Sequence, residues 1–161
     1  MPATLFKIPL VRWVRGTIER MNAAGKDDRE TWDNHWFTTY KDLGGQSDSS
    51  GSKICPKRAA YGIWCLGRIS NSGRTFENWT LESVRKELGK NAVYAVLALD
   101  LLEMKRGRRG TEGDWSNAEL WAKVQETYQK KLGELTAHKQ EGAVTIALGL
   151  FTEGQTLSRP Q

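Results

Sequence analysis

The stretch Cys55-Pro-Lys-Arg-Ala-Ala-Tyr-Gly-Ile-Trp-Cys-Leu-Gly67 decides the fold of this chain. Pro56 suits the first turn of a helix, and Gly67 is typical of the position that follows one. The apolar side chains between them recur at helical spacing and give the segment an apolar side. We therefore expect a helix here that packs into the core of the protein.

The rest of the chain shows the same periodicity of three and four residues, and no segment shows sustained period-two alternation. The segment 92–104 is apolar nearly all round, which places it at the centre of the core. Capping boxes are predicted at Asp27…Glu30 and at Ser116…Glu119. The fold class is therefore all-α, a compact helical domain of about six helices over residues 1–157 with a frayed tail at 158–161. Besides the stretch above, helices are expected over 9–22, 29–43, 81–88, 92–104, 116–132 and 140–152.

Two features recur in the same order along the chain. The final apolar stretch, 145–154, resembles 60–67 in its glycine and apolar skeleton, and each expected capping box is followed two residues later by a tryptophan. These matches favour an internal repeat of two related helical halves, 9–69 and 91–155. Chance similarity between amphipathic helices is the alternative.

The composition excludes several classes of protein. A hydrophobic fraction of 39% with seven Trp is enough for a real core and argues against intrinsic disorder. The longest apolar run, 92–99, falls far short of the roughly 20 residues that cross a membrane. On one helix, Cys55 and Cys65 would lie about 15 Å apart, beyond the roughly 7 Å that a disulfide spans. We expect a cytoplasmic protein without a signal peptide, membrane span or disulfide framework.

The net charge of +5 is concentrated in the middle of the chain, where residues 51–111 hold 12 Lys and Arg against 5 Asp and Glu. Such a basic region is a weak indication of a polyanion partner, DNA or RNA, and a solvated surface is the alternative. Arginine and lysine would neutralise phosphates, and Trp79 and Trp115 are candidates for stacking on bases. The nucleic-acid-binding candidates are Lys57, Arg58, Lys105, Arg106, Arg108 and Arg109.

Catalytic and metal chemistry have little support. Cys55 at a helix start has its thiolate favoured by the helix dipole and, with His35 or His138 as a base, is a candidate nucleophile. A buried Cys-Pro helix start explains the same residues. The two Cys and two His have no metal-ligand spacing, so no metal and no cofactor is expected. Asp100 interrupts the most apolar helix, and we expect it to pair with a Lys or Arg.

The chain also resembles an uncharacterised bacterial family of small helical proteins, a domain of unknown function, over roughly residues 28–157. The resemblance is carried by the Cys-Pro-x-x-Ala start at Cys55, by Gly62 and Gly67, by Tyr94-Ala95 and Leu120-Trp121, and by Gly154. It implies a compact helical fold and a bacterial or mobile-element origin, and it brings no activity. The segment from His138 to Gly142 departs from the His-Asn pattern of that family.

Since no catalytic constellation is visible, the sequence favours a non-enzymatic binding protein. We expect a protein–protein interaction module, such as an adaptor or an inhibitor encoded by a mobile element or phage. An inhibitor that mimics DNA would need an acidic surface, which the basic middle argues against. Nucleic-acid binding through residues 51–111 is the first alternative, and an enzyme with Cys55 as nucleophile is the second.

Overall fold

The computed structural model of this protein describes residues 2–107, 115–137 and 142–159. Within them the chain is mostly helical, as expected from the sequence, and a two-stranded hairpin precedes the first helix. The elements are β1 (Thr4–Leu5), β2 (Ile8–Pro9), α1 (Leu10–Ala24), α2 (Arg29–Asp42), α3 (Asp48–Gly51), α4 (Ile54–Cys65), α5 (Leu81–Glu87), α6 (Lys90–Arg106), α7 (Asn117–Leu132) and α8 (Ala143–Thr152).

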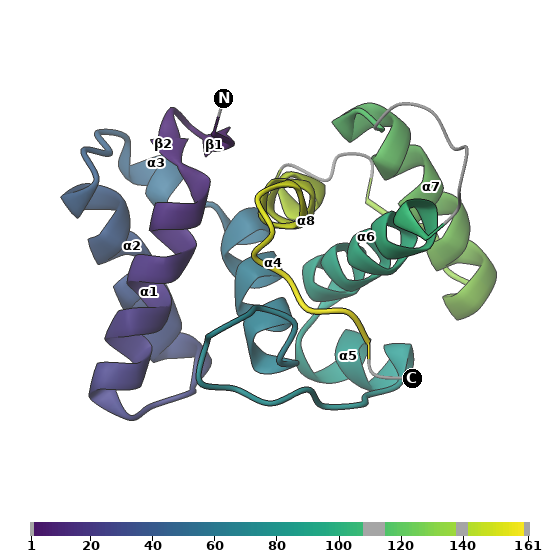
Figure 1. Ribbon diagram of the computed structural model, residues 1–161, viewed down its shortest axis with the longest axis horizontal. Coiled ribbons are helices and arrows are strands. Elements are labelled where there is room, and N and C mark those ends of the chain that lie inside the picture. The colour runs from purple at the N-terminus through teal and green to yellow at the C-terminus, as the bar shows by residue number, and fades with distance from the viewer. Residues whose placement is uncertain (1, 108–114, 138–141, 160–161) are drawn as a thin grey trace.

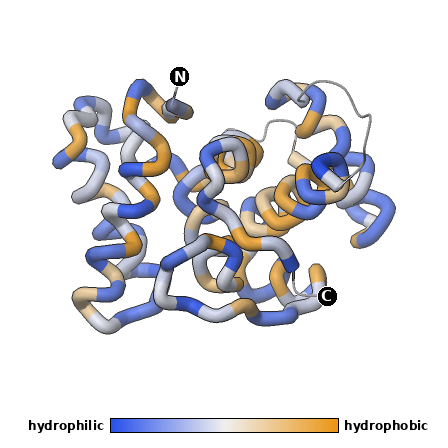
Figure 2. The backbone as a smooth tube through the Cα atoms, viewed as in Figure 1, coloured by the Kyte–Doolittle hydropathy of each residue, from blue (hydrophilic) through white to orange (hydrophobic). Residues whose placement is uncertain are grey.

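Helices α4 and α8 lie between two helix pairs, α1 with α2 on one side and α6 with α7 on the other (Figure 1). The apolar colouring is concentrated on α6 and α8 in Figure 2. Every residue from 92 to 99 of α6 is buried, and α6 packs against α4, α5, α7 and α8. The prediction that this helix forms the centre of the core is therefore confirmed.

Gly62 sets how closely α4 approaches α6. A Cβ atom placed on Gly62 would lie 2.4 Å from the Cβ of Ala92 and 3.1 Å from its Cα. Real Cβ atoms do not come this close, so the contact between the two helices depends on the absence of a side chain at this position. The stretch around Gly62 is thus a core helix, as its pattern predicted.

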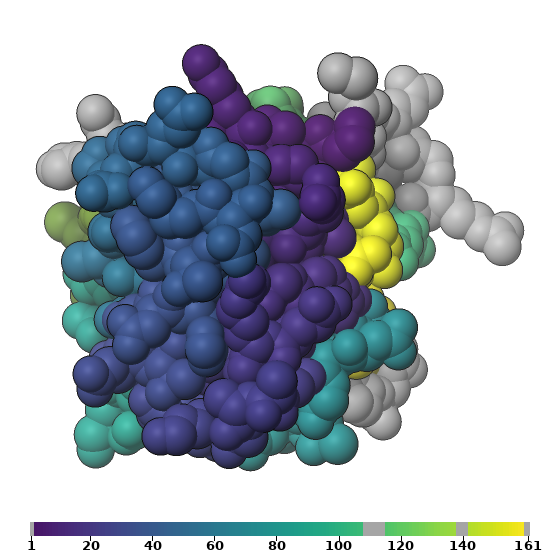
Figure 3. Space-filling model, turned by 90° about the vertical axis from the view of Figure 1, so that its left-hand side faces the viewer, coloured from purple at the N-terminus to yellow at the C-terminus, as the bar shows by residue number. Residues whose placement is uncertain are grey.

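A cluster of tryptophans joins α1, α2 and α4. The ring centroids of Trp13 and Trp36 are 4.4 Å apart, and those of Trp32 and Trp64 are 5.1 Å apart. The indole Nε1 of Trp13 donates to the Trp36 carbonyl at 2.9 Å. This cluster lies beneath the face that α1, α2 and α3 cover in Figure 3. Large buried rings contribute strongly to stability, so the pair α1 and α2 is fixed firmly to α4.

The cap of α2 and the start of α6 differ from expectation. Asp28, and not Asp27, caps α2, because its carboxylate accepts from the Thr31 amide at 3.0 Å; the capping box expected at Asp27…Glu30 was wrong. The second box is confirmed, with Ser116 and Glu119 bonded to each other's backbone. Helix α6 begins at Lys90 after Gly89, two residues before the start expected at 92.

Short local features account for the other differences. The hairpin turn at Phe6 and Lys7 has positive φ angles of 52° and 68°, and strands of two residues are too short to show an alternating pattern. Ser47 caps the short helix α3, which lies between the helices expected at 29–43 and from Cys55. The internal repeat stays a prediction; α1–α2–α4 and α6–α7–α8 follow one another in matching order.

Candidate functional site

A groove of about 820 Å³ lies between α6, α7, the segment that leads into α5 and the C-terminal segment. Its apolar lining comes from Leu81 of α5 and from Leu97, Leu101 and Met104 of α6. Met104 keeps 55% of its surface exposed. A volume of this size lies within the range of pockets that bind ligands.

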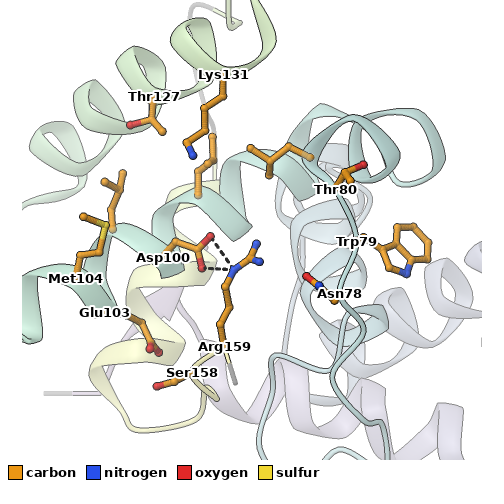
Figure 4. A pocket seen from close by; sticks show the side chains of 13 residues that line it. Asn78, Trp79, Thr80, Asp100, Glu103, Met104, Thr127, Lys131, Ser158 and Arg159 are labelled. Carbon is orange, nitrogen blue, oxygen red and sulfur yellow. Dashed lines mark hydrogen bonds and ion pairs between the residues drawn. The ribbon is translucent and has the colours of Figure 1, made fainter. Parts of the chain in front are cut away.

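Asp100 lies in this groove and is held from two sides (Figure 4). The Nη1 of Arg68 donates to Oδ1 of Asp100 at 3.0 Å, and Nε of Arg159 donates to Oδ1 at 3.2 Å and to Oδ2 at 3.3 Å. The side chain of Arg68 is 2% exposed, whereas that of Asp100 is 27% exposed. The expectation that Asp100 pairs with a basic residue is confirmed, and its carboxylate still faces the groove.

Arg68 is the most deeply buried charge in the described part of the chain. Its Nε donates to the Leu157 carbonyl at 2.9 Å, and its Nη2 has no hydrogen-bond partner among the described residues. Arginine has five donors in a rigid fork, so one buried guanidinium fixes both the carboxylate of α6 and the backbone of the C-terminal segment. Arg68 therefore positions two walls of the groove.

The C-terminal segment reaches the groove as an extended strand. Thr156 forms an antiparallel bridge with Ile69, and the Ser70 amide donates to the Gln155 carbonyl at 2.9 Å. The Leu157 amide donates to the Arg68 carbonyl at 2.9 Å. Beyond Leu157, Ser158 and Arg159 line the groove. These two residues belong to the tail that was expected to fray, and Arg159 reaches α6.

Several polar side chains at the rim have unused hydrogen-bonding capacity. Asn78, Glu103, Lys131 and Ser158 line the groove, and none of these side chains bonds to another described residue. Figure 4 shows Lys131 on α7 and Asn78 before α5 on different sides of the pair of Asp100 and Arg159. The rim therefore offers donors and acceptors around an apolar floor.

The predicted nucleic-acid-binding residues fall into two groups that no contact joins in the described part of the chain. Arg58 forms two hydrogen bonds to Asp33, and Lys57 lies 3.8 Å from the same carboxylate. Their side chains are only 20% and 12% exposed. This pair faces α2, on the left of Figure 1, whereas α6 ends on the right. Lys57 and Arg58 thus help to join α4 to α2.

Lys105 and Arg106 occupy the last turn of α6. The Nζ of Lys105 lies 4.8 Å from the ring centroid of Trp115, and the guanidinium carbon of Arg106 lies 4.2 Å from that of Phe151. Both cations keep access to solvent, Arg106 more than Lys105. Arg108 and Arg109, which complete the predicted set, lie outside the described residues. Trp79 and Trp115 are half-buried, with Trp79 lining the groove.

Cys55 lies at the second position of α4, near Tyr94 of α6. Burial raises the pKa of Tyr94, and the neighbouring Glu134 and Cys55 raise it further. Beside it, Tyr128 and Arg85 both donate to Glu134, the latter at 2.9 Å. These two hydrogen bonds lower the pKa of Glu134, and burial raises that of Tyr128.

These groups near Cys55 satisfy one another, which is typical of a structural network. Cys55 and Cys65 lie at opposite ends of α4, so no disulfide joins them. His138, one of the two bases considered for Cys55, lies outside the described residues, and the hypothesis of a Cys55 nucleophile stays untested.

The following holds for residues 2–107, 115–137 and 142–159. In these residues no three His, Cys, Asp or Glu side chains gather closely enough to hold a metal ion. No helix there is long and apolar enough to cross a membrane.

Sequence reasoning singled out Asp100 but missed the groove around it. Asn78 and Arg159 lie 81 residues apart along the chain, with Lys131 between them, and only the tertiary structure brings all three to one groove. The signal that pointed toward this site was the acidic residue at the end of an otherwise apolar run.

A family model described as a family of unknown function (DUF6979) matches residues 12–155 of this chain. No curated protein and no solved structure matches it. The matched range contains the groove residues of α5, α6 and α7, and it ends before Ser158 and Arg159.

Proposed function

The chain belongs to the family of unknown function DUF6979, which brings no activity, and we propose that it is a non-enzymatic protein-binding module. An extended segment of a partner protein binds in the groove between α5, α6 and α7. The observation that carries this proposal is the chain's own C-terminal segment. It arrives at the groove as an extended strand, pairs with Ile69 and places Arg159 on Asp100.

The lining of the groove suits a peptide. An extended peptide directs alternate side chains to opposite sides, while its backbone offers donors and acceptors between them. Leu81, Leu101 and Met104 provide apolar contact for side chains. Lys131 can donate to a backbone carbonyl, and Asn78 can both donate and accept. An adaptor or an inhibitor would use such a groove.

The charged groups of the groove favour binding over catalysis. Asp100 is held by two guanidinium groups, which makes it an anchor for a cation. General acid–base chemistry requires a group that exchanges its proton near the working pH. Glu103 and Lys131 also line the groove, and the Thr127 hydroxyl, one turn from Lys131, donates to the Lys123 carbonyl at 2.9 Å.

A peptide selection tests this function. Random 12-residue peptides displayed on phage are selected against the full chain, and the enriched peptides are measured by fluorescence anisotropy. Thr127→Trp fills the groove from α7, whereas Gln129→Trp changes an exposed residue of the same helix that does not line it. We expect enriched peptides to bind the wild type and Gln129→Trp alike and to bind Thr127→Trp at least about tenfold more weakly. Peptides that bind all three proteins equally, or no enrichment, would refute the proposal.

Nucleic-acid binding at the end of α6 is a second candidate function. It is favoured by Lys105 and Arg106, which lie together in the last turn and precede Gly107 and further arginines in the sequence. Anisotropy with short DNA and RNA at several salt concentrations tests it. Phosphate contacts require an affinity that falls steeply with salt. Replacing Arg106, Arg108 and Arg109 together by Ala should weaken this binding and leave the fold intact; binding that is absent at low salt would rule it out.

A further inference from the structure

The contact between Arg159 and Asp100 uses only part of the hydrogen-bonding capacity of either side chain. Both distances, 3.2 and 3.3 Å, run from a single nitrogen, Nε of Arg159, to the two carboxylate oxygens. In Figure 4 the two terminal nitrogens of Arg159 extend away from Asp100. An arginine and a carboxylate interact most strongly as a fork of two parallel hydrogen bonds, so this contact is weaker than the one these groups can form.

Arg159 is also held loosely. Its side chain is 41% exposed, and it lies two residues beyond Leu157, the last residue with a backbone bond to another segment in the described chain. Ion pairs with this degree of exposure contribute little to stability. Arg159 can therefore leave Asp100 while the strand formed by residues 155–157 stays in place.

Asp100, in contrast, is fixed. Arg68 lies behind it, 2% exposed, and holds Oδ1 at 3.0 Å. A carboxylate accepts about four hydrogen bonds, so Oδ2 keeps acceptor sites that face the groove. Glu103 lies three residues later, on the same side of α6, and also lines the groove with no partner among the described residues. Residues three apart are neighbours on a helix, so both carboxylates line the groove from the same side of α6.

We propose that the Asp100 carboxylate is the recognition point for a guanidinium group on the partner segment, and that Arg159 occupies this point in the unbound protein. The inference rests on the proposed function and names the chemistry of its ligand, an extended segment that carries an arginine. The incoming guanidinium forms a forked pair with Asp100 and reaches Glu103 with its remaining donors. Arg68 is a positioning residue, because it holds the carboxylate without contacting the ligand.

The probe for this inference is N-acetyl-arginine N-methylamide, with the neutral citrulline analogue as its matched control. Binding to the full chain is followed by NMR, through the indole of Trp79 and the carboxylate carbon of Asp100. We expect the arginine probe to bind in roughly the millimolar range, as befits a small exposed ligand, and its affinity to fall with salt. The citrulline probe should not bind. A citrulline probe that binds equally well would overturn the inference.

Two variants of Arg159 test whether the probe displaces Arg159 from Asp100 or is only attracted by the negative charge of the groove. Arg159→Gln removes the internal competitor, and the arginine probe should then bind about two- to fivefold more tightly, as expected for the loss of an exposed ion pair. Arg159→Lys keeps the charge and should bind the probe about as the wild type does. Glu103→Gln should weaken binding without disturbing the pair of Arg68 and Asp100. An unchanged affinity in both Arg159→Gln and Glu103→Gln would refute the inference.

The outcomes also distinguish this inference from the proposed function. If selected peptides bind the groove equally well after every arginine is replaced by citrulline, the protein-binding function stands and the guanidinium site is refuted. If the arginine probe binds as expected but no peptide does, the site stands and the peptide function is refuted. A dimer that forms with rising concentration and is lost in Arg159→Gln would identify the occupant as the tail of a second copy, and would overturn the proposal of a separate partner.

Discussion

Replacing Gly62 by alanine tests the packing on which the groove depends. The new Cβ would meet the Cβ of Ala92 at 2.4 Å, and neither atom has a rotamer by which to move away. The backbones of α4 and α6 must therefore separate. Overpacking of this kind costs about 1–3 kcal/mol, and a contact between two Cβ atoms belongs at the upper end. Alanine recovers about 1 kcal/mol of helix propensity. The expected net loss is about 2 kcal/mol.

Thermal unfolding followed by circular dichroism measures this loss. For a chain of this size, about 2 kcal/mol lowers the Tm by roughly 4–8 °C. Gly107→Ala is the matched control, because its Cβ would meet only backbone oxygens, at 3.6 and 3.7 Å, and its φ is −72°. That variant should unfold at the wild-type temperature or slightly above it. If the Tm of Gly62→Ala equals the Tm of Gly107→Ala, the close packing of α4 on α6 at Gly62 is refuted.

Three further predictions concern single contacts. Trp13→Phe should lower the free energy of unfolding by about 2 kcal/mol in urea denaturation, because it removes the buried hydrogen bond to the Trp36 carbonyl and part of a ring stack. A loss below a few tenths of a kcal/mol would contradict this prediction. Ser116→Ala should cost about 1 kcal/mol by the same assay through the lost capping box, and Ser116→Thr should restore most of it. Burial raises the pKa of Cys65 to about 11 from 9.0. The folded state therefore holds this proton more strongly, and stability should fall as the pH rises from about 9 to 11. Cys65→Ala should flatten this decline of stability with pH. An equal slope of stability against pH in the wild type and in Cys65→Ala would contradict the prediction.

The helices were predictable where packing and local sequence agree. The apolar run at 92–99 and the stretch around Gly62 gave the two central helices, because burial on all sides leaves a clear pattern. Gly25 ends α1 in the left-handed conformation, with φ of 65°, as the sequence indicated. Helix α2 begins at the expected residue, but its cap is Asp28 and not Asp27, because two aspartates stand side by side and only Asp28 contacts Thr31.

The groove was less predictable, because its residues are brought together by the tertiary structure. The basic middle of the sequence suggested a continuous positive surface. In the fold, much of that charge is neutralised in pairs, such as Arg58 with Asp33 and Arg68 with Asp100. Asp33 lies outside 51–111, and a count of charges over that range includes Asp100 without showing that it pairs with Arg68, 32 residues away.

Mapping the contact site of a selected peptide by NMR tests the central claim most directly. We expect chemical-shift changes in the backbone amides of Trp79, Met104 and Thr127, which come from the segment before α5, from α6 and from α7 and all line the groove. The amides of α1 and α2 should stay unchanged, and the changes should disappear in Thr127→Trp. Shifts centred on α1 and α2, or shifts that persist in Thr127→Trp, would contradict the account.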